Sequence, residues 1–143
     1  MSEGEPLEGI ALADALLGRE FPLPTTPLPL ARWVEVQRLG AGAEVSWNLD
    51  DTRPGVPARL ALYAGPERPP AHDLRDATPP AELEHAGHSY THRSAPLPEA
   101  QGSLRPVHEL SWTDAGLCLR LTAQGPWAIS ELLRIAASVG SGA

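Results

Sequence analysis

A period of two in apolar and polar residues recurs along the middle of this chain and limits its fold more than any other feature. The alternation is clear in "RWVEVQRL", "AEVSWNLD" and "ARLALYAG", and it returns on both sides of "TDAG" closer to the C-terminus. The Asp and Gly of "TDAG" predict a tight hairpin turn between those two strands. Successive side chains of a β-strand point to opposite faces, so this period is typical of half-buried antiparallel strands. The pattern from Trp33 to Ala123 predicts about six or seven of them.

Segments with a helical period flank the strands. Apolar residues between Ile10 and Leu17 share one face and Gly18 offers a stop, which predicts a short helix. In "ISELLRIAAS" the apolar residues cover one wide side, whereas Ser130 and Arg134 lie on the other, as in a helix that packs on a sheet as a structural plug. We therefore expect one α+β domain over residues 1–143, in the order helix, extended strap, antiparallel strands, helix.

Prolines interrupt this order in two places. The segment "FPLPTTPLPL", residues 21–30, must be extended, and its apolar alternation favours a strap on the protein body over a proline-rich ligand for a partner domain. Residues 65–80 contain five prolines and no strand pattern, so we expect a long loop and the most mobile internal part of the chain. Residues 1–6 and 140–143 are expected to be disordered.

Composition excludes several classes of partner and location. All eleven basic residues are arginines scattered singly, and the net charge is -7, which argues against binding to nucleic acid or to anionic membranes. Cys118 is the one cysteine, so no internal disulfide is possible. The N-terminal twenty residues carry acids where a signal peptide has positive charge, and no stretch reaches the roughly 20 apolar residues of a membrane span. These features predict a cytoplasmic protein.

The stretch "HAGHSYTH" holds the sharpest candidate for chemistry. His85, His88 and His92 lie close together in sequence, next to several carboxylates, as in sites for Zn²⁺ or another borderline metal. Gly87 and the neighbouring hydroxyl residues favour an extended chain, on which His88 and His92 would stand about 13 Å apart. The spacing therefore favours solvated imidazoles over a metal site, and we expect no cofactor.

Signals for nucleophilic catalysis are weak. The chain has no G-x-S-x-G elbow and no phosphate-binding glycine loop. Cys118 alternates with Leu117 and Leu119 in a predicted strand, where a lone cysteine is usually an inert small apolar group. No acid, base and oxyanion donor can be named together, so we expect that the protein is not an enzyme.

The C-terminal stretch "ELSWTDAGLCLRLTAQGPWAISELLRIAASV" resembles the signature of an uncharacterised bacterial domain family, often attached to anti-sigma-factor-like proteins. That family is distantly similar to the lipoprotein-carrier and sigma-regulator β-fold. The resemblance implies a single curved antiparallel sheet, a partial barrel, with helices packed on its concave side, and it transfers no catalytic residues. The matching positions are Trp112, Gly116, Leu132, Leu133, Ile135, Ala136 and Ser138.

These observations favour a non-enzymatic protein-interaction or regulatory binding module with an unidentified protein partner. Trp33 faces away from Val34 and Val36 in its predicted strand, and we expect it to anchor an apolar interaction patch. Two alternatives stay open. One is a small carrier that holds an apolar, lipid-like ligand between the sheet and the helices. The other is a metal-dependent enzyme that uses His85, His88 and His92.

Overall fold

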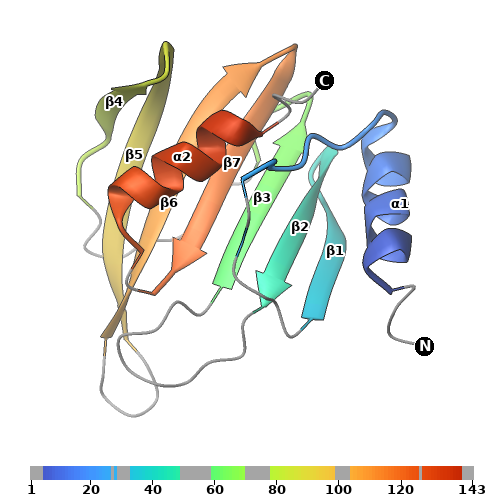
Figure 1. The fold of residues 1–143 in the computed structure, drawn as a ribbon, viewed down its shortest axis with the longest axis horizontal. Helices are drawn as coiled ribbons and strands as arrows, with labels where there is room; N and C mark the ends of the chain where they lie inside the picture. The colour runs from blue at the N-terminus through green and yellow to red at the C-terminus, as the bar shows by residue number, and fades with distance from the viewer. Residues whose placement is uncertain are drawn as a thin grey trace.

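A computed structural model describes residues 5–26, 28, 33–48, 59–69, 78–98, 104–125 and 127–139 (Figure 1). Helix α1 begins at Glu5, so residues 5 and 6 of the stretch expected to be disordered are helical. The described elements are α1 (Glu5–Leu17), β1 (Trp33–Leu39), β2 (Gly42–Asn48), β3 (Arg59–Gly65), β4 (Ala81–His85), β5 (His88–Pro98), β6 (Leu104–Asp114), β7 (Leu117–Gln124) and α2 (Ile129–Ser138).

The strands form one antiparallel sheet of seven strands in the order β1-β2-β3-β7-β6-β5-β4. This arrangement confirms the predicted α+β class, the number of strands and the helix at each end of the strand region. Strands β1 and β4 are the two ends of that order, so the described sheet is open and not closed into a barrel.

Two tight turns between neighbouring strands have the same Ala-Gly sequence. Ala86 and Gly87 join β4 to β5, and Ala115 and Gly116 join β6 to β7. All four residues have positive φ, between 51° and 82°, as two-residue hairpin turns of type I′ require. The turn that "TDAG" predicts is therefore confirmed, with alanine at a position that asparagine or aspartate usually takes.

One face of the sheet is apolar and is covered by α2. A register row across five strands consists of Val36, Val45, Leu62, Leu121 and Leu110. Helix α2 contacts β4, β6 and β7, and it buries Leu132 and Ile135 against this face. The helix therefore packs on the sheet as its apolar side predicts, and its three buried large side chains, Leu132, Leu133 and Ile135, contribute on the order of 1.5–3 kcal/mol each.

The proline-rich strap joins the two ends of the molecule. Phe21 is buried, and its amide donates to Asp14 Oδ1 in α1 at 2.7 Å. The amides of Thr25 and Thr26 both donate to Ser138 Oγ at 3.1 Å, at the C-terminal end of α2. The backbone of the described strap residues therefore bonds to both α1 and α2. These contacts agree with the expectation that the segment packs against the protein body.

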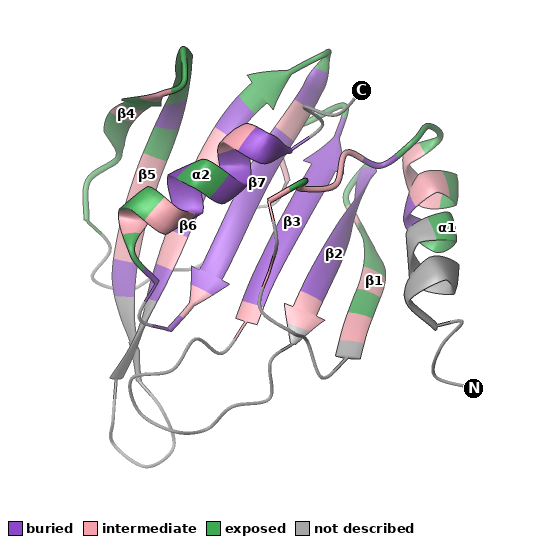
Figure 2. Cartoon of the chain, viewed as in Figure 1, coloured by how far each residue is buried: buried purple, intermediate pink, exposed green. Residues whose placement is uncertain are grey.

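The central strands are buried on both faces, which the period-two pattern does not predict. Figure 2 shows β3 and β7 buried over most of their length, whereas β4 at the edge is mostly exposed. The polar residues of the central strands therefore lie in a covered face. Alternation between apolar and polar residues looks the same whether the polar face is covered or solvated, so the sequence carries no signal for this burial.

The connection from β3 to β4 must pass three intervening strands, a distance of about 19 Å between the two strand axes. Its described ends contribute Arg68, Pro69 and Pro80 to a cavity on the face opposite α2. Residues 70–77, on which the prediction of high mobility mainly falls, lie outside the described residues, as do 140–143.

Candidate functional site

On the face opposite α2, one register row carries a polar side chain on every strand. Antiparallel pairing places these residues opposite one another in turn, so the row crosses the whole sheet. Polar and charged groups are rarely buried unless they are paired, which makes the buried middle of this row, Arg120, Tyr63 and Glu44, the most informative feature of the fold. From β4 to β1 the row consists of Glu82, Thr91, Ser111, Arg120, Tyr63, Glu44 and Gln37.

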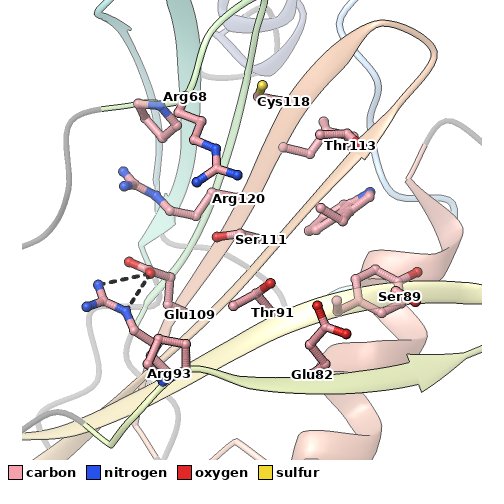
Figure 3. A pocket seen from close by; sticks show the side chains of 15 residues that line it. Arg68, Glu82, Ser89, Thr91, Arg93, Glu109, Ser111, Thr113, Cys118 and Arg120 are labelled. Carbon is pink, nitrogen blue, oxygen red and sulfur yellow. Dashed lines mark hydrogen bonds and ion pairs between the residues drawn. The ribbon is translucent and has the colours of Figure 1, made fainter.

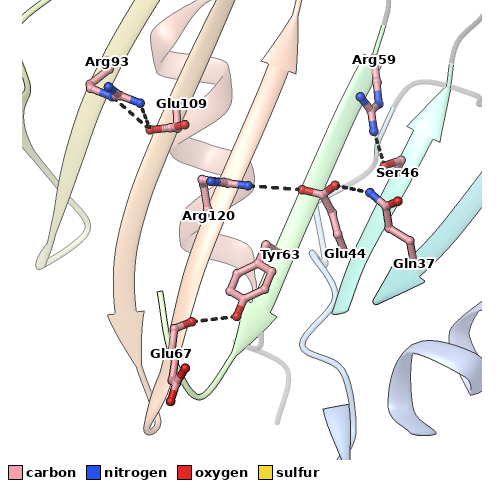
Figure 4. Close-up of polar contacts among 9 residues, drawn as sticks. All are labelled: Gln37, Glu44, Ser46, Arg59, Tyr63, Glu67, Arg93, Glu109 and Arg120. Atoms are coloured by element: carbon pink, nitrogen blue, oxygen red, sulfur yellow. Dashed lines mark hydrogen bonds and ion pairs between the residues drawn. The ribbon is translucent and has the colours of Figure 1, made fainter. Parts of the chain in front are cut away.

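Arg120 lies near the centre of this row, in a chain of polar contacts (Figure 4). Its Nη2 is 3.9 Å from Glu44 Oε2, and both side chains are almost fully buried, at 4% and 6% exposed. Gln37 Nε2 donates to the other oxygen of Glu44 at 3.1 Å. Burial lowers the pKa of Arg120, and the carboxylates of Glu109 and Glu44 act in the opposite direction. Arginine stays protonated despite such shifts, so the buried guanidinium is a fixed positive charge.

A second ion pair lies in the neighbouring row. Arg93 donates to Glu109 Oε1 from Nε at 3.2 Å and from Nη2 at 3.1 Å. Tyr63, between Arg120 and Glu44 in the sheet, donates its hydroxyl to the backbone oxygen of Glu67 at 2.7 Å. Burial raises the pKa of Tyr63, so this phenol is neutral at physiological pH.

A cavity of about 500 Å³ lies above these rows, at strands β4 to β7 (Figure 3). Its volume is within the range of about 300–1,000 Å³ that is typical of small-molecule sites. Side chains on the polar face form its floor, and both ends of the β3–β4 connection contribute to its wall. The charged, hydroxyl and thiol side chains that line the cavity are Arg68, Glu82, Ser89, Thr91, Arg93, Glu109, Ser111, Thr113, Cys118 and Arg120.

The floor is a grid set by the strand register. Thr91 and Ser111 are direct partners on β5 and β6, and Arg120 follows on β7. Thr113 pairs with Cys118 one row further along. Hydroxyl groups both donate and accept hydrogen bonds, and guanidinium groups bind carboxylates and phosphates in a planar fork.

The lining is less negative than the chain as a whole. Three lining arginines, Arg68, Arg93 and Arg120, face two lining carboxylates, Glu82 and Glu109. Glu44 lies outside the lining, 3.9 Å from Arg120, and balances the remaining positive charge. The lining together with this carboxylate is therefore close to neutral, in a protein of net charge -7.

The structure does not bring the three predicted metal ligands together. His85 and His88 pair across the β4–β5 turn, and His92 lies four residues further along β5. Among the described residues no group of three His, Cys, Asp or Glu side chains is arranged to hold a metal ion. The hypothesis of a site formed by His85, His88 and His92 is therefore wrong in its geometry, because an extended strand separates its imidazoles.

His92 instead meets His108 of β6. His92 Nε2 is 3.3 Å from His108 Nδ1, and the ring planes differ by 18°. Burial lowers the pKa of both imidazoles, and His92 lowers that of His108 further. His108 shares one face of β6 with Leu110 and Trp112, and the register that brings it to His92 depends on the pairing of β5 with β6.

Two other predicted residues have different outcomes. Trp33 pairs with Asn48 through the backbone of β1, and its side chain lies outside the described residues. Of the large apolar side chains that the structure describes, Leu12 in α1 is the exposed one, so these residues show no apolar patch. Cys118 does alternate with its leucine neighbours, but it is half-buried in the wall of the polar cavity and not in an apolar environment.

Comparison with known proteins gives no relative. No protein-family model matches the sequence, and searches of curated proteins and of solved structures find no match either. None of the helices in the described part of the chain has the length and apolar character to cross a membrane.

Proposed function

We propose that the protein is a non-catalytic binding module that holds a small anionic group, a carboxylate or a phosphate, in the cavity on the polar face of the sheet. The observation that carries this proposal is the guanidinium of Arg120, which is buried in the cavity floor next to the hydroxyl groups of Thr91 and Ser111. A fixed positive charge surrounded by hydroxyl groups matches a ligand with one anionic end and further polar groups.

The energetics of the polar face support a binding role. Replacing a buried ion pair by apolar residues of similar volume is often neutral or stabilising, so stability alone gives a weak reason for Arg120 and Glu44 in the middle of a sheet. A ligand that binds the guanidinium gives a direct reason for the charge. Glu109 already accepts two hydrogen bonds from Arg93, and Arg120 lies beside Glu44. The exposed Arg68 is therefore the lining cation most accessible to an added anion, with Arg120 behind it in the floor.

The alternatives have less support. A carrier for an apolar ligand needs a predominantly apolar cavity, whereas this lining combines Tyr90, Trp112 and Leu119 with arginines, carboxylates and hydroxyl groups, and α2 covers the apolar face. A metal-dependent enzyme built on His85, His88 and His92 lacks convergent ligands. The resemblance to domains attached to anti-sigma-factor-like proteins, with helices on the concave side of a curved sheet, supports a regulatory role. We place this module in the cytoplasm on the basis of its acidic composition and single cysteine.

Titration of ¹⁵N-labelled protein tests the proposal. Succinate and inorganic phosphate are added separately at constant ionic strength, and neutral succinamide is added as the uncharged counterpart. We expect saturable shifts of the amides around Thr91, Ser111 and Arg120 with at least one anion and none with succinamide. The anion that binds more tightly shows whether the cavity prefers a carboxylate or a phosphate.

Variants at the surface of the cavity keep this test independent of folding. Arg68 is exposed, so Arg68→Ala removes a lining cation without opening the core, and we expect binding to weaken about tenfold, which corresponds to one charge-assisted hydrogen bond. Arg134→Ala, an exposed arginine on α2, is the matched control. Absence of saturable shifts with both anions, equal shifts with succinamide, or equal affinity in the Arg68 and Arg134 variants would overturn the proposal.

A further inference from the structure

We propose that His92 and His108 form a two-histidine site for a borderline transition-metal ion such as Zn²⁺, on the α2 side of the sheet. This inference is independent of the anion site, which lies on the opposite face. The register pairs His92 with Leu110 and His108 with Ser94, so the two imidazoles are diagonal neighbours on adjacent strands.

The separation of the two nitrogens fits shared coordination. With Zn–N bonds of about 2.0–2.1 Å at a tetrahedral angle, two ligating nitrogens stand about 3.3–3.4 Å apart. His92 Nε2 and His108 Nδ1 are 3.3 Å apart. The ring centroids are 5.5 Å apart and the planes differ by 18°, so the two nitrogens face each other across the gap between the rings. A rotation of each ring by about 35° directs both lone pairs at one point within Zn–N bonding distance.

The protonation of the pair suits metal binding. A neutral imidazole has one N–H and one lone pair, and its tautomer is set by its partners. Metal binding requires the proton of His92 on Nδ1 and that of His108 on Nε2. Both rings are already held neutral by burial, so this change of tautomer needs no net loss of a proton, and the ion competes with a hydrogen bond only.

The surroundings of the pair define what kind of site it is. Burial lowers the pKa of both rings, and the neighbouring His92 lowers that of His108 further; among the described residues no carboxylate or cation is a cause of either shift. Both residues are half-buried and so in part open to solvent, from which water would supply the remaining ligands. Two protein ligands with water in the other positions describe an open site, in contrast to closed four-ligand structural zinc.

Isothermal titration of the metal-free protein with ZnCl₂ tests this site. We expect one saturable binding event per chain, weakened by more than about tenfold in His92→Gln and in His108→Gln, since even loss of an outer partner of a metal ligand costs that much. His88→Gln is the matched control, because His88 is an exposed histidine on the same strand. Circular dichroism establishes that each variant is folded.

A second measurement uses the unaltered chain, so it tests the site even if the variants fail to fold. Zinc should shift the imidazole ¹⁵N signals of His92 Nε2 and His108 Nδ1 and leave those of the other histidines in place. Loss of zinc binding in His88→Gln, unchanged affinity in folded His108→Gln, or shifts confined to other histidines would each contradict the site. None of these readouts depends on succinate or phosphate, so failure of one proposal leaves the other standing.

Discussion

Replacing Arg120 with methionine removes the positive charge that two buried carboxylates share. Glu44 is 4% exposed and Glu109 is 7% exposed, so neither carboxylate regains much water when the guanidinium is lost. Removing one partner of a buried ion pair typically costs about 3–5 kcal/mol. Each carboxylate keeps one donor at 3.1 Å, Gln37 for Glu44 and Arg93 for Glu109, so we expect a loss near the lower end, about 3 kcal/mol.

Urea unfolding at pH 7, followed by tryptophan fluorescence, measures this loss. Arg120→Met is compared with Glu44→Gln and with the double variant, which removes both charges of the pair. We expect the double variant to be at least about 1 kcal/mol more stable than the sum of the two single losses implies, because the orphaned carboxylate is then absent. Arg134→Met on the exposed side of α2 should change stability by less than about 0.5 kcal/mol.

A small loss of stability in Arg120→Met would contradict the premise that the guanidinium neutralises buried carboxylates. A deficit below about 1 kcal/mol at pH 7, relative to the unaltered protein, would refute the reasoning.

Three further predictions concern the apolar face and the strap. Leu133→Ala in α2 should destabilise the protein by about 2–5 kcal/mol in urea unfolding, and melting within a degree of the parent would show that this helix is peripheral. Ser138→Ala removes the acceptor of two strap amides and should cost about 1–3 kcal/mol, whereas a variant as stable as the parent would mean that water replaces the hydroxyl. Because burial lowers the folded-state pKa of His92 and His108, the unfolded chain binds protons first, and stability should fall as pH drops below about 6.5. Replacing both histidines with glutamine should flatten the profile below that pH, and an equal slope in parent and variant would assign it to other groups.

The strands, both helices and the hairpin turn at "TDAG" are predictable from the sequence because each depends on local periodicity. The order of the strands in the sheet is not predictable from the sequence. Strand β3 pairs with β7, and the length of the connection that follows β3 does not indicate which strand lies next to it. The polar row with its proposed anion site is not predictable either, for the same reason. Arg120 and Glu44 are 76 residues apart in sequence and alternate like solvated residues, and they meet because β2, β3 and β7 are neighbours.

The histidines show that residues close together in sequence need not meet in the structure. "HAGHSYTH" places three imidazoles within eight residues, but a strand carries its side chains forward by about 3.4 Å per residue and keeps them roughly parallel. His108 is 16 residues from His92, yet it lies within hydrogen-bonding distance because β5 and β6 pair antiparallel. A sequence signal for this pair exists only after the register of the two strands is known.

The same register explains why the two faces of β5 and β6 differ so strongly. His92 and Arg93 are consecutive, as are His108 and Glu109, so each strand places one residue of each pair on each face. A slip of one residue moves every side chain of a strand to the other face. A slipped β5 would carry Arg93 under α2 and leave Glu109 buried without its partner, and an unpaired buried charge costs several kcal/mol. An apolar pair at these positions would remove that penalty and leave two faces of similar character, so the charges of the polar face specify the register of the sheet in addition to forming the proposed site.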